Sequence, residues 1–153
     1  MAFTIQSNAF GEGGGIPPKF TCEGHDLSPE LKWSDAPSLT KSYALIVDDP
    51  DAPGGTWTHW IVWNIPSLAT ALPEAVPKEK NLDDGTRQGV NDFKRIGYGG
   101  PCPPPGKPHR YFFRLYALGA MLDLKAGAPR DELESAMHEH VLTHTTLMGT
   151  YQR

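Results

Sequence analysis

The chain has 153 residues, enough for one well-buried core and too few for two ordinary domains, so a single domain over residues 1–153 is expected. Its net charge of −4 excludes a broad basic surface for nucleic acid. No apolar run approaches the roughly 18 residues needed to cross a bilayer. Since residues 1–5 contain neither a basic region nor an apolar secretion core, we expect a cytoplasmic location.

Short strands are predicted for the first half of the chain, because apolar residues alternate or cluster in short segments bounded by turn residues. The expected strands cover residues 3–5, 19–22, 31–33, 43–47 and 58–65. The strand at 43–47 is the clearest, and its end delivers two aspartates to the rim of a sheet. Along 58–65, period-two alternation predicts that His59, Ile61 and Trp63 share one face.

The second half of the chain begins with a long connection, residues 67–98, which is uncommon at this length without a function. A strand is expected over 109–118. Helical spacing of apolar residues predicts one helix over about 130–142, and a closing strand follows at 147–151. Many short strands without a βαβ alternation predict a mainly antiparallel β architecture.

The two cysteines, Cys22 and Cys102, could be two thiols or one disulfide. One pair is no disulfide framework, so we expect reduced thiols in a cytoplasmic protein. The sequence has no C-x-x-C spacing. His140 and His144 are four residues apart on the predicted helix but have no assigned third ligand, so no metal site is expected.

The most informative segment is 99–111, with the sequence G-G-P-C-P-P-P-G-K-P-H-R-Y. Glycine lets backbone N–H groups approach a ligand closely, and proline fixes the shape of the loop before binding. The segment leads straight into the strand that begins at His109. It therefore predicts a preformed cradle for a small anion, with an imidazole at its rim.

A second segment, 48–60, reads D-D-P-D-A-P-G-G and then T-W-T-H-W. An imidazolium, a phenol and backbone N–H groups can all donate to phosphate oxygens, whereas a carboxylate cannot donate unless it is protonated. Asp49 would therefore orient a histidine or share a proton with the anion. Taken singly, Asp49 could equally be a turn residue before proline, and His59 a core histidine.

The blocks D-P-D-A-P, W-T-H-W and G-G-P-C-P-P with P-H-R-Y closely resemble the motifs of the phosphatidylethanolamine-binding protein family, nearest its bacterial and archaeal Raf-kinase-inhibitor-like branch. The resemblance extends from about Phe3 to Tyr151. It implies a mainly β fold in which a large antiparallel-rich central sheet packs on a smaller sheet, with flanking helices. It also implies a homodimer, and it favours a cis X–Pro bond in the turn at 49–53.

The resemblance identifies the polar groups as an anion pocket for phosphate, a phosphoethanolamine-like head group or a carboxylate. The expected ligand-binding residues are Asp49, Asp51, Trp57, His59, Gly100, Cys102, His109 and Tyr111. Gly100 and Cys102 are expected to act through their backbone. No cofactor is expected.

We interpret the chain as a non-enzymatic binding or regulatory protein, and the resemblance implies inhibition of a kinase or a protease through the pocket. Two alternatives stay open. A small hydrolase or lyase could use the Asp/His cluster, with Cys102 as a nucleophile beside His109. A structural or interaction protein could carry a vestigial pocket. A turnover assay tests the first alternative, and a phosphate titration tests the second.

Overall fold

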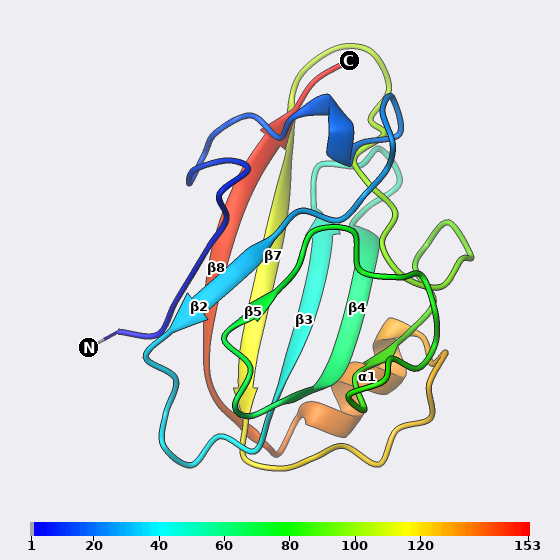
Figure 1. Cartoon of the computed structure of the whole chain (residues 1–153). Coiled ribbons are helices and arrows are strands. Elements are labelled where there is room, and N and C mark those ends of the chain that lie inside the picture. Colours follow the sequence, from blue (N-terminus) through cyan, green and yellow to red (C-terminus); the bar gives the residue numbers. More distant parts are fainter. Residues whose placement is uncertain (1) are drawn as a thin grey trace.

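The computed structural model describes residues 2–153, in which two antiparallel sheets pack face to face (Figure 1). The larger sheet has five strands in the order β6-β4-β3-β7-β8, and the smaller sheet has three in the order β1-β2-β5. The elements are β1 (Thr4–Gln6), a 3-10 helix (Pro18–Phe20), β2 (Leu31–Ser34), β3 (Ser42–Asp49), β4 (Trp57–Pro66), β5 (Ala71–Leu72), β6 (Arg87–Gln88), β7 (His109–Leu118), α1 (Arg130–Met137) and β8 (Val141–Tyr151). This arrangement confirms the predicted mainly β fold with a large sheet packed on a smaller one. None of the helices within residues 2–153 is long and apolar enough to span a membrane.

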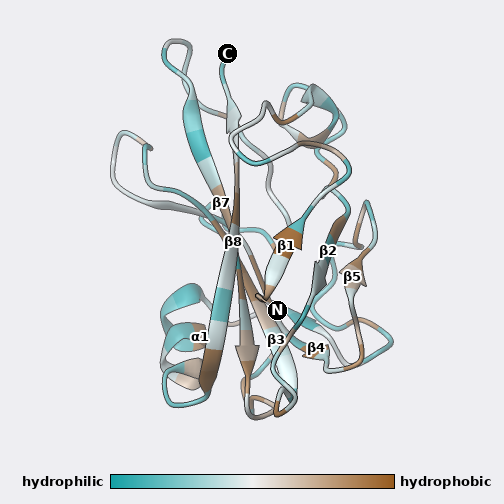
Figure 2. Cartoon of the chain, turned by 90° about the vertical axis from the view of Figure 1, so that its left-hand side faces the viewer, coloured by the Kyte–Doolittle hydropathy of each residue, from teal (hydrophilic) through white to brown (hydrophobic). Residues whose placement is uncertain are grey.

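The apolar core forms two layers, one on each face of the larger sheet (Figure 2). One layer lies between the two sheets and includes Leu45 and Trp60. The other lies beneath α1 and includes Ile46 and Ile61. β3 is buried along its whole length because both of its faces are covered. The smaller sheet and α1 therefore protect opposite faces of the same central strands.

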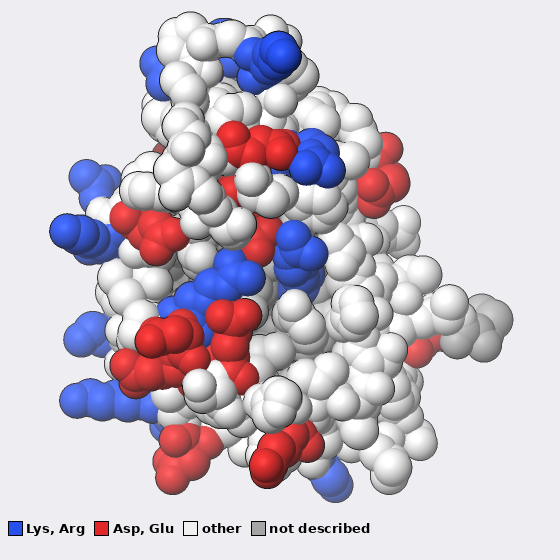
Figure 3. Space-filling model, turned by 180° about the vertical axis from the view of Figure 1, so that it is seen from behind, with Lys and Arg blue, Asp and Glu red and all other residues white. Residues whose placement is uncertain are grey.

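A buried carboxylate fastens α1 to the larger sheet. The Oδ1 atom of Asp48 lies 3.0 Å from Nη2 of Arg114 on β7, and its Oδ2 atom lies 2.9 Å from Nη1 of Arg130, the first residue of α1. The Nε atom of Arg130 also lies 3.4 Å from Oε1 of Glu134, one helical turn later. Basic and acidic side chains interleave on this side of the molecule (Figure 3). These ion pairs hold the first turn of α1 against β3 and β7.

The helix is shorter, and the last strand longer, than predicted. α1 ends at Met137 and β8 begins at Val141, whereas the helix was expected to continue to about residue 142. β8 pairs with β7 along its whole length, from Leu118 opposite Val141 to His109 opposite Tyr151. Residues 141 and 142 therefore belong to a strand, although their apolar spacing also suits a helix. Pairing with β7 overrides the local helix propensity.

The two histidines singled out as a weak metal pair do not share a helix. His140 lies in the turn after α1, and His144 lies on β8 opposite Tyr116. Within residues 2–153, no group of three or more histidine, cysteine or acidic side chains is placed to hold a metal ion.

The segment 19–22 forms a turn rather than the expected strand, and this turn carries a disulfide. A 3-10 helix follows Pro17, and the turn after it brings Cys22 to Cys102, whose Cα atom lies 5.4 Å away and whose sulfur is bonded to that of Cys22. The Cys22 amide also donates to the carbonyl of Pro101 at 3.1 Å. The prediction of two reduced thiols is wrong because residues 99–108, which we call the proline-rich loop, fold back onto a turn that lies 80 residues earlier in the chain.

The turn at 49–53 contains no cis peptide bond. All the peptide bonds that the structure describes are trans, including those before Pro50 and Pro53, so the prediction of a cis X–Pro bond is wrong. The side chain of Asp49 closes the turn instead, because its Oδ1 accepts a hydrogen bond from the Asp51 amide at 2.7 Å.

Candidate functional site

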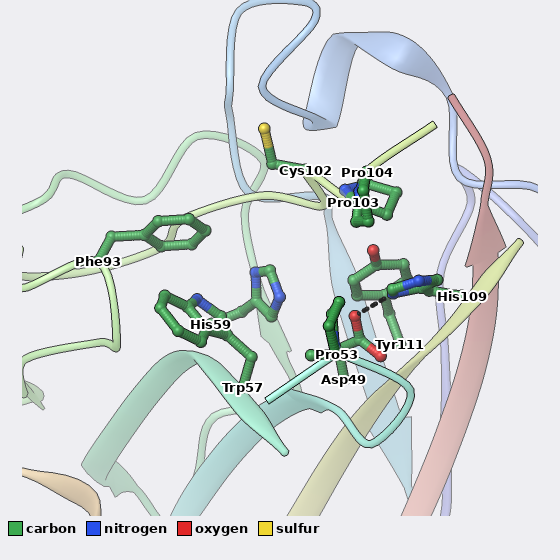
Figure 4. Close-up of a pocket in the computed structure, with 11 residues that line it drawn as sticks. Asp49, Pro53, Trp57, His59, Phe93, Cys102, Pro103, Pro104, His109 and Tyr111 are labelled. Atoms are coloured by element: carbon green, nitrogen blue, oxygen red, sulfur yellow. Dashed lines mark hydrogen bonds and ion pairs between the residues drawn. The ribbon is translucent and has the colours of Figure 1, made fainter. Parts of the chain in front are cut away.

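A cavity of about 200 Å³, which we call the strand-end pocket, opens where three strands of the larger sheet meet (Figure 4). β3 ends here, and its antiparallel neighbours β4 and β7 begin here, so their terminal side chains gather at one edge of the sheet. The lining residues are Asp49, Ala52, Pro53, Trp57, His59, Phe93, Cys102, Pro103, Pro104, His109 and Tyr111. Of the residues predicted for the site, Asp51 and Gly100 lie outside this lining.

A β-bulge turns His59 into the pocket. Asp48 pairs with Thr58 and Val47 pairs with Trp60, which leaves His59 as an extra residue between them. Its ring packs edge to face on that of Tyr111, with centroids 5.2 Å apart, on the side of the sheet where Trp60 also lies. The expectation that His59 shares a face with Ile61 and Trp63, which pack beneath α1, is therefore wrong, because a bulge changes the direction of a side chain.

His109 and Asp49 form a nearly buried pair. The Nδ1 atom of His109 lies 2.7 Å from Oδ2 of Asp49, and the two side chains are 11% and 4% exposed. Since the other oxygen of Asp49 accepts the Asp51 amide, both carboxylate oxygens are engaged. The carboxylate thus fixes the orientation of the imidazole, and the second ring nitrogen of His109 is the one that can meet a ligand.

His59 is held in a single tautomer by the proline-rich loop. A carbonyl only accepts hydrogen bonds, so the contact of 2.6 Å between Nδ1 of His59 and the oxygen of Gly99 places a proton on Nδ1. Burial lowers the pKa of His59 from its usual value of 6.5, although the Gly99 carbonyl and the charge of Asp49 act in the opposite direction. A neutral His59 therefore presents Nε2 as an acceptor, rather than the donor expected of an imidazolium.

The hydroxyl of Tyr111 is the one side-chain polar atom of the strand-end pocket that is both buried and unpaired among the described residues. Burial, followed by the charge of Asp49, raises the pKa of Tyr111, so the phenol keeps its proton. A buried hydroxyl without a partner is costly, since it has lost its bonds to water and gained none in return. The Tyr111 hydroxyl can therefore donate a hydrogen bond to a ligand in the pocket.

The aromatic side chains of Trp57 and Phe93 flank the opening of the pocket, and the sequence predicted only the first of them. Trp57 was predicted, and its ring packs on that of Phe93 with centroids 5.5 Å apart. Phe93 also packs on His59 at 5.4 Å. The side chain of Asn91 places Phe93, because its Oδ1 accepts from the amides of Phe93 and Arg95 at 2.9 and 3.2 Å. Only the unusual length of the 67–98 connection indicated a functional role for this part of the chain.

Asp51 braces the turn from outside. Its carboxylate accepts hydrogen bonds from Nε and Nη2 of Arg110, each at 2.9 Å, and from the Arg110 amide at 3.0 Å. These hydrogen bonds lower the pKa of Asp51 to about 2. The residue thus holds the 49–53 turn against the start of β7, and Arg110 engages both of its carboxylate oxygens.

The glycines of the proline-rich loop do not form the expected cradle of free N–H groups. The Gly99 amide donates to the carbonyl of His59 at 2.9 Å, and the Gly100 amide donates to Oδ1 of Asp26 at 2.7 Å. A Cβ atom on Gly100 would lie 2.2 Å from the carbonyl oxygen of Phe20, so close backbone packing requires glycine there. The residues of this loop that line the pocket are Cys102, Pro103 and Pro104, and Cys102 is bonded to Cys22.

Comparison with known proteins matches almost the whole chain to one family. The sequence model described as phosphatidylethanolamine-binding protein matches residues 6–152. A UPF0098 protein of Methanothermobacter thermautotrophicus is 50% identical over 149 residues, which cover 97% of this chain and 98% of the relative. A UPF0098 protein of Pyrococcus horikoshii is 52% identical, with 96% of this chain and 75% of the relative covered.

Solved structures share the same fold. A phosphatidylethanolamine-binding protein homologue from Chlamydia trachomatis has a TM-score of 0.91 at 39% identity, covering 99% of this chain and 98% of its own. An Escherichia coli protein described as a member of the mammalian family of this name has a TM-score of 0.93 at 34% identity, covering 100% of this chain and 99% of its own.

Proposed function

Because this chain belongs to the phosphatidylethanolamine-binding protein family, we propose that it is a non-enzymatic binding protein whose strand-end pocket holds a small phosphate-like anion. The observation that carries the proposal is the buried, unpartnered hydroxyl of Tyr111. A buried polar group without a partner costs about 1–3 kcal/mol, and an oxygen of the ligand would offset that cost.

The hydrogen-bonding groups of the pocket match a phosphate that retains one proton. Tyr111 donates through its hydroxyl, and His109, held by Asp49, presents its second ring nitrogen. His59 accepts through Nε2 because its Nδ1 proton is used by Gly99. A phosphomonoester monoanion, or inorganic phosphate in either of its protonated forms, can donate to His59 through its P–OH group and accept from Tyr111. A phosphomonoester dianion has no proton to donate, so the protonated form is the ligand form proposed here.

Regulation is the role proposed for this binding. A phosphorylated or carboxylate group of a target protein, such as a kinase or a protease, would occupy the pocket of a homodimeric regulator. The disulfide removes the Cys102 thiolate that a thiol hydrolase would need. In a turnover assay on phosphoesters and peptides we expect no product from the oxidised protein. Sustained turnover would instead support the hydrolase alternative.

The cytoplasmic location proposed from the sequence requires that the Cys22–Cys102 disulfide persist in that compartment. Reducing cytosols rarely keep structural disulfides, although intracellular proteins of hyperthermophiles often do. Alkylation of free thiols in intact cells, followed by mass spectrometry of the purified protein, tests the location. Alkylated Cys22 and Cys102 indicate a reducing compartment, and two unmodified residues indicate an oxidising one.

A phosphate titration tests the proposed ligand directly. Inorganic phosphate should shift the ring resonances of His59 and His109 with roughly millimolar affinity, equivalent to about 4 kcal/mol. The Tyr111→Phe variant should weaken binding by about tenfold, because a hydrogen bond to a charged ligand is lost. The same variant should be as stable as the parent or slightly more stable, since it removes a buried unpaired hydroxyl.

Tyr43→Phe is the matched control, since the Tyr43 hydroxyl donates to the carbonyl of Ser67 at 3.4 Å, away from the pocket. This variant should bind phosphate like the parent. The proposal fails if phosphate at tens of millimolar, roughly tenfold above the expected dissociation constant, perturbs neither histidine. It also fails if Tyr111→Phe binds as well as Tyr43→Phe.

A further inference from the structure

A second cavity, of about 670 Å³, lies beside the strand-end pocket and shares two of its walls. We call it the loop cavity. It is lined by Cys22, Asp26, Lys78, Asn91, Phe93, Arg95, Ile96, Tyr98, Gly99, Gly100 and Cys102. Phe93 and Cys102 line both cavities, so the ring and the disulfide form the partition between them. The volume falls within the range of small-molecule sites in proteins.

The inner surface of the loop cavity is apolar. The ring of Tyr98 is almost fully buried, and its hydroxyl is turned away to donate to the carbonyl of Phe20 at 2.7 Å. Phe93, Ile96 and the disulfide supply further apolar surface. The amides of Gly99 and Gly100, which also line the cavity, are already engaged by other groups. The apolar part of a ligand would therefore contact aromatic rings, the side chain of Ile96 and the disulfide. Few polar groups of the cavity would lose hydrogen bonds on binding.

The rim of the loop cavity is cationic. Lys78 and Arg95 are both exposed, and Asp26 is the one carboxylate among the lining residues. Oδ1 of Asp26 accepts the Gly100 amide, and its Oδ2 lies 3.4 Å from Nζ of Lys78, a long contact for an ion pair. The guanidinium of Arg95 forms no ion pair with any described residue. The rim thus keeps a positive charge that is not neutralised.

We propose that the loop cavity binds an apolar anion, a molecule with a hydrocarbon or aromatic body and a single carboxylate, sulfonate or similar acidic group. The acidic group lies between Arg95 and Lys78, and the body packs on Phe93 and Ile96, above the buried ring of Tyr98. An apolar interior with a few oriented charges at its mouth is the arrangement that selects such ligands. This site is separate from the phosphate-like site, and it stands whether or not phosphate binds in the strand-end pocket.

Fluorescence titration with 8-anilinonaphthalene-1-sulfonate, an aromatic sulfonate, tests the loop cavity. We expect saturable binding of one molecule per chain to the folded protein, checked by a melting temperature that does not fall when the dye is added. Arg95→Ala and Lys78→Ala should each weaken binding by about fivefold, because each removes one cation from the rim. Lys41→Ala, which removes an exposed cation just before β3, should leave binding unchanged.

Two further measurements locate the ligand and define its charge. Ile96→Trp should abolish binding of the dye by filling the cavity, with the melting temperature reported alongside to show that the variant is folded. Decanoate should displace the dye, whereas decylamine, with the same hydrocarbon body and the opposite charge, should not. The proposal is overturned if the rim variants and Ile96→Trp bind the dye like the parent. It is equally overturned if decylamine competes as well as decanoate, or if phosphate displaces the dye and thereby places it in the strand-end pocket.

Discussion

Asp49 and His109 join the ends of two neighbouring strands, β3 and β7, through a contact of 2.7 Å between a carboxylate oxygen and a ring nitrogen. Both side chains are nearly buried, so each depends on the other to satisfy its polar atoms. Removing one partner of a buried pair leaves the other without compensation, which is more costly than losing an exposed ion pair. The pair therefore stabilises this edge of the sheet and also forms part of the proposed binding site.

Asp49→Asn separates these two contributions, because it keeps the size of the side chain and removes its charge. We expect a loss of about 1–3 kcal/mol in the free energy of unfolding, measured by urea denaturation. Phosphate affinity should fall by about tenfold, since His109 loses the charged acceptor that orients it. Asp51→Asn is the control: its carboxylate lies outside the pocket, so affinity should be retained. Parent-like phosphate binding by Asp49→Asn would contradict the role given to the pair.

The free energy of unfolding should decrease as the pH falls, because His59 is buried in the folded protein. Burial holds the pKa of the folded residue below 6.5, so the unfolded chain takes up the proton first as the pH falls. The free energy of unfolding should therefore fall below about pH 6.5, with a slope of up to about 1.4 kcal/mol per pH unit from this residue alone. Urea titrations between about pH 7.5 and pH 5 measure the slope. His59→Gln should reduce it, and an unchanged slope in that variant would show that other groups account for the acid sensitivity.

The regular strands could be predicted from sequence because their periodicity is local. β7 covers residues 109–118 as expected, since apolar residues alternate there without interruption. The inward turn of His59 could not be predicted in the same way. It depends on a bulge that exists only when β4 pairs with β3, and a one-residue slip changes the face of a side chain.

The parts of the site that were missed depend on contacts between distant segments. Phe93 reaches the pocket because Asn91 organises a loop inside a long connection with no periodic pattern. The Cys22–Cys102 bond joins residues separated by 80 positions, and a cysteine count cannot distinguish that bond from two thiols. The Gly100 amide was expected to bind a ligand, but Oδ1 of Asp26, 74 positions earlier, accepts its hydrogen bond.

Reduction of the disulfide should destabilise the protein without unfolding it at room temperature. Disulfides typically contribute about 2–4 kcal/mol by restricting the unfolded chain, and bonds that close long loops such as this one lie at or above the upper end of that range. Hydrogen bonds from the Cys22 and Gly100 amides still connect the proline-rich loop to the 3-10 helix region. We expect a lower melting temperature in the presence of a phosphine reductant, with two free thiols per chain by colorimetric titration. An unchanged melting temperature with both thiols free would show that the loop is held by its other contacts alone.

Asp48→Ala should destabilise the fold from the face opposite the strand-end pocket. It leaves Arg114 and Arg130 without the buried carboxylate that joins them, and breaking such a network costs about 3–5 kcal/mol. Glu134→Ala is the matched control, because it removes only the exposed partner of Arg130 and should cost about 0.5 kcal/mol or less. Urea denaturation measures both variants. Phosphate affinity at a temperature where Asp48→Ala is folded should equal that of the parent, since the side chain points toward α1 while the neighbouring Asp49 points toward the smaller sheet. Loss of phosphate binding by the folded variant would show that the two faces of β3 are coupled.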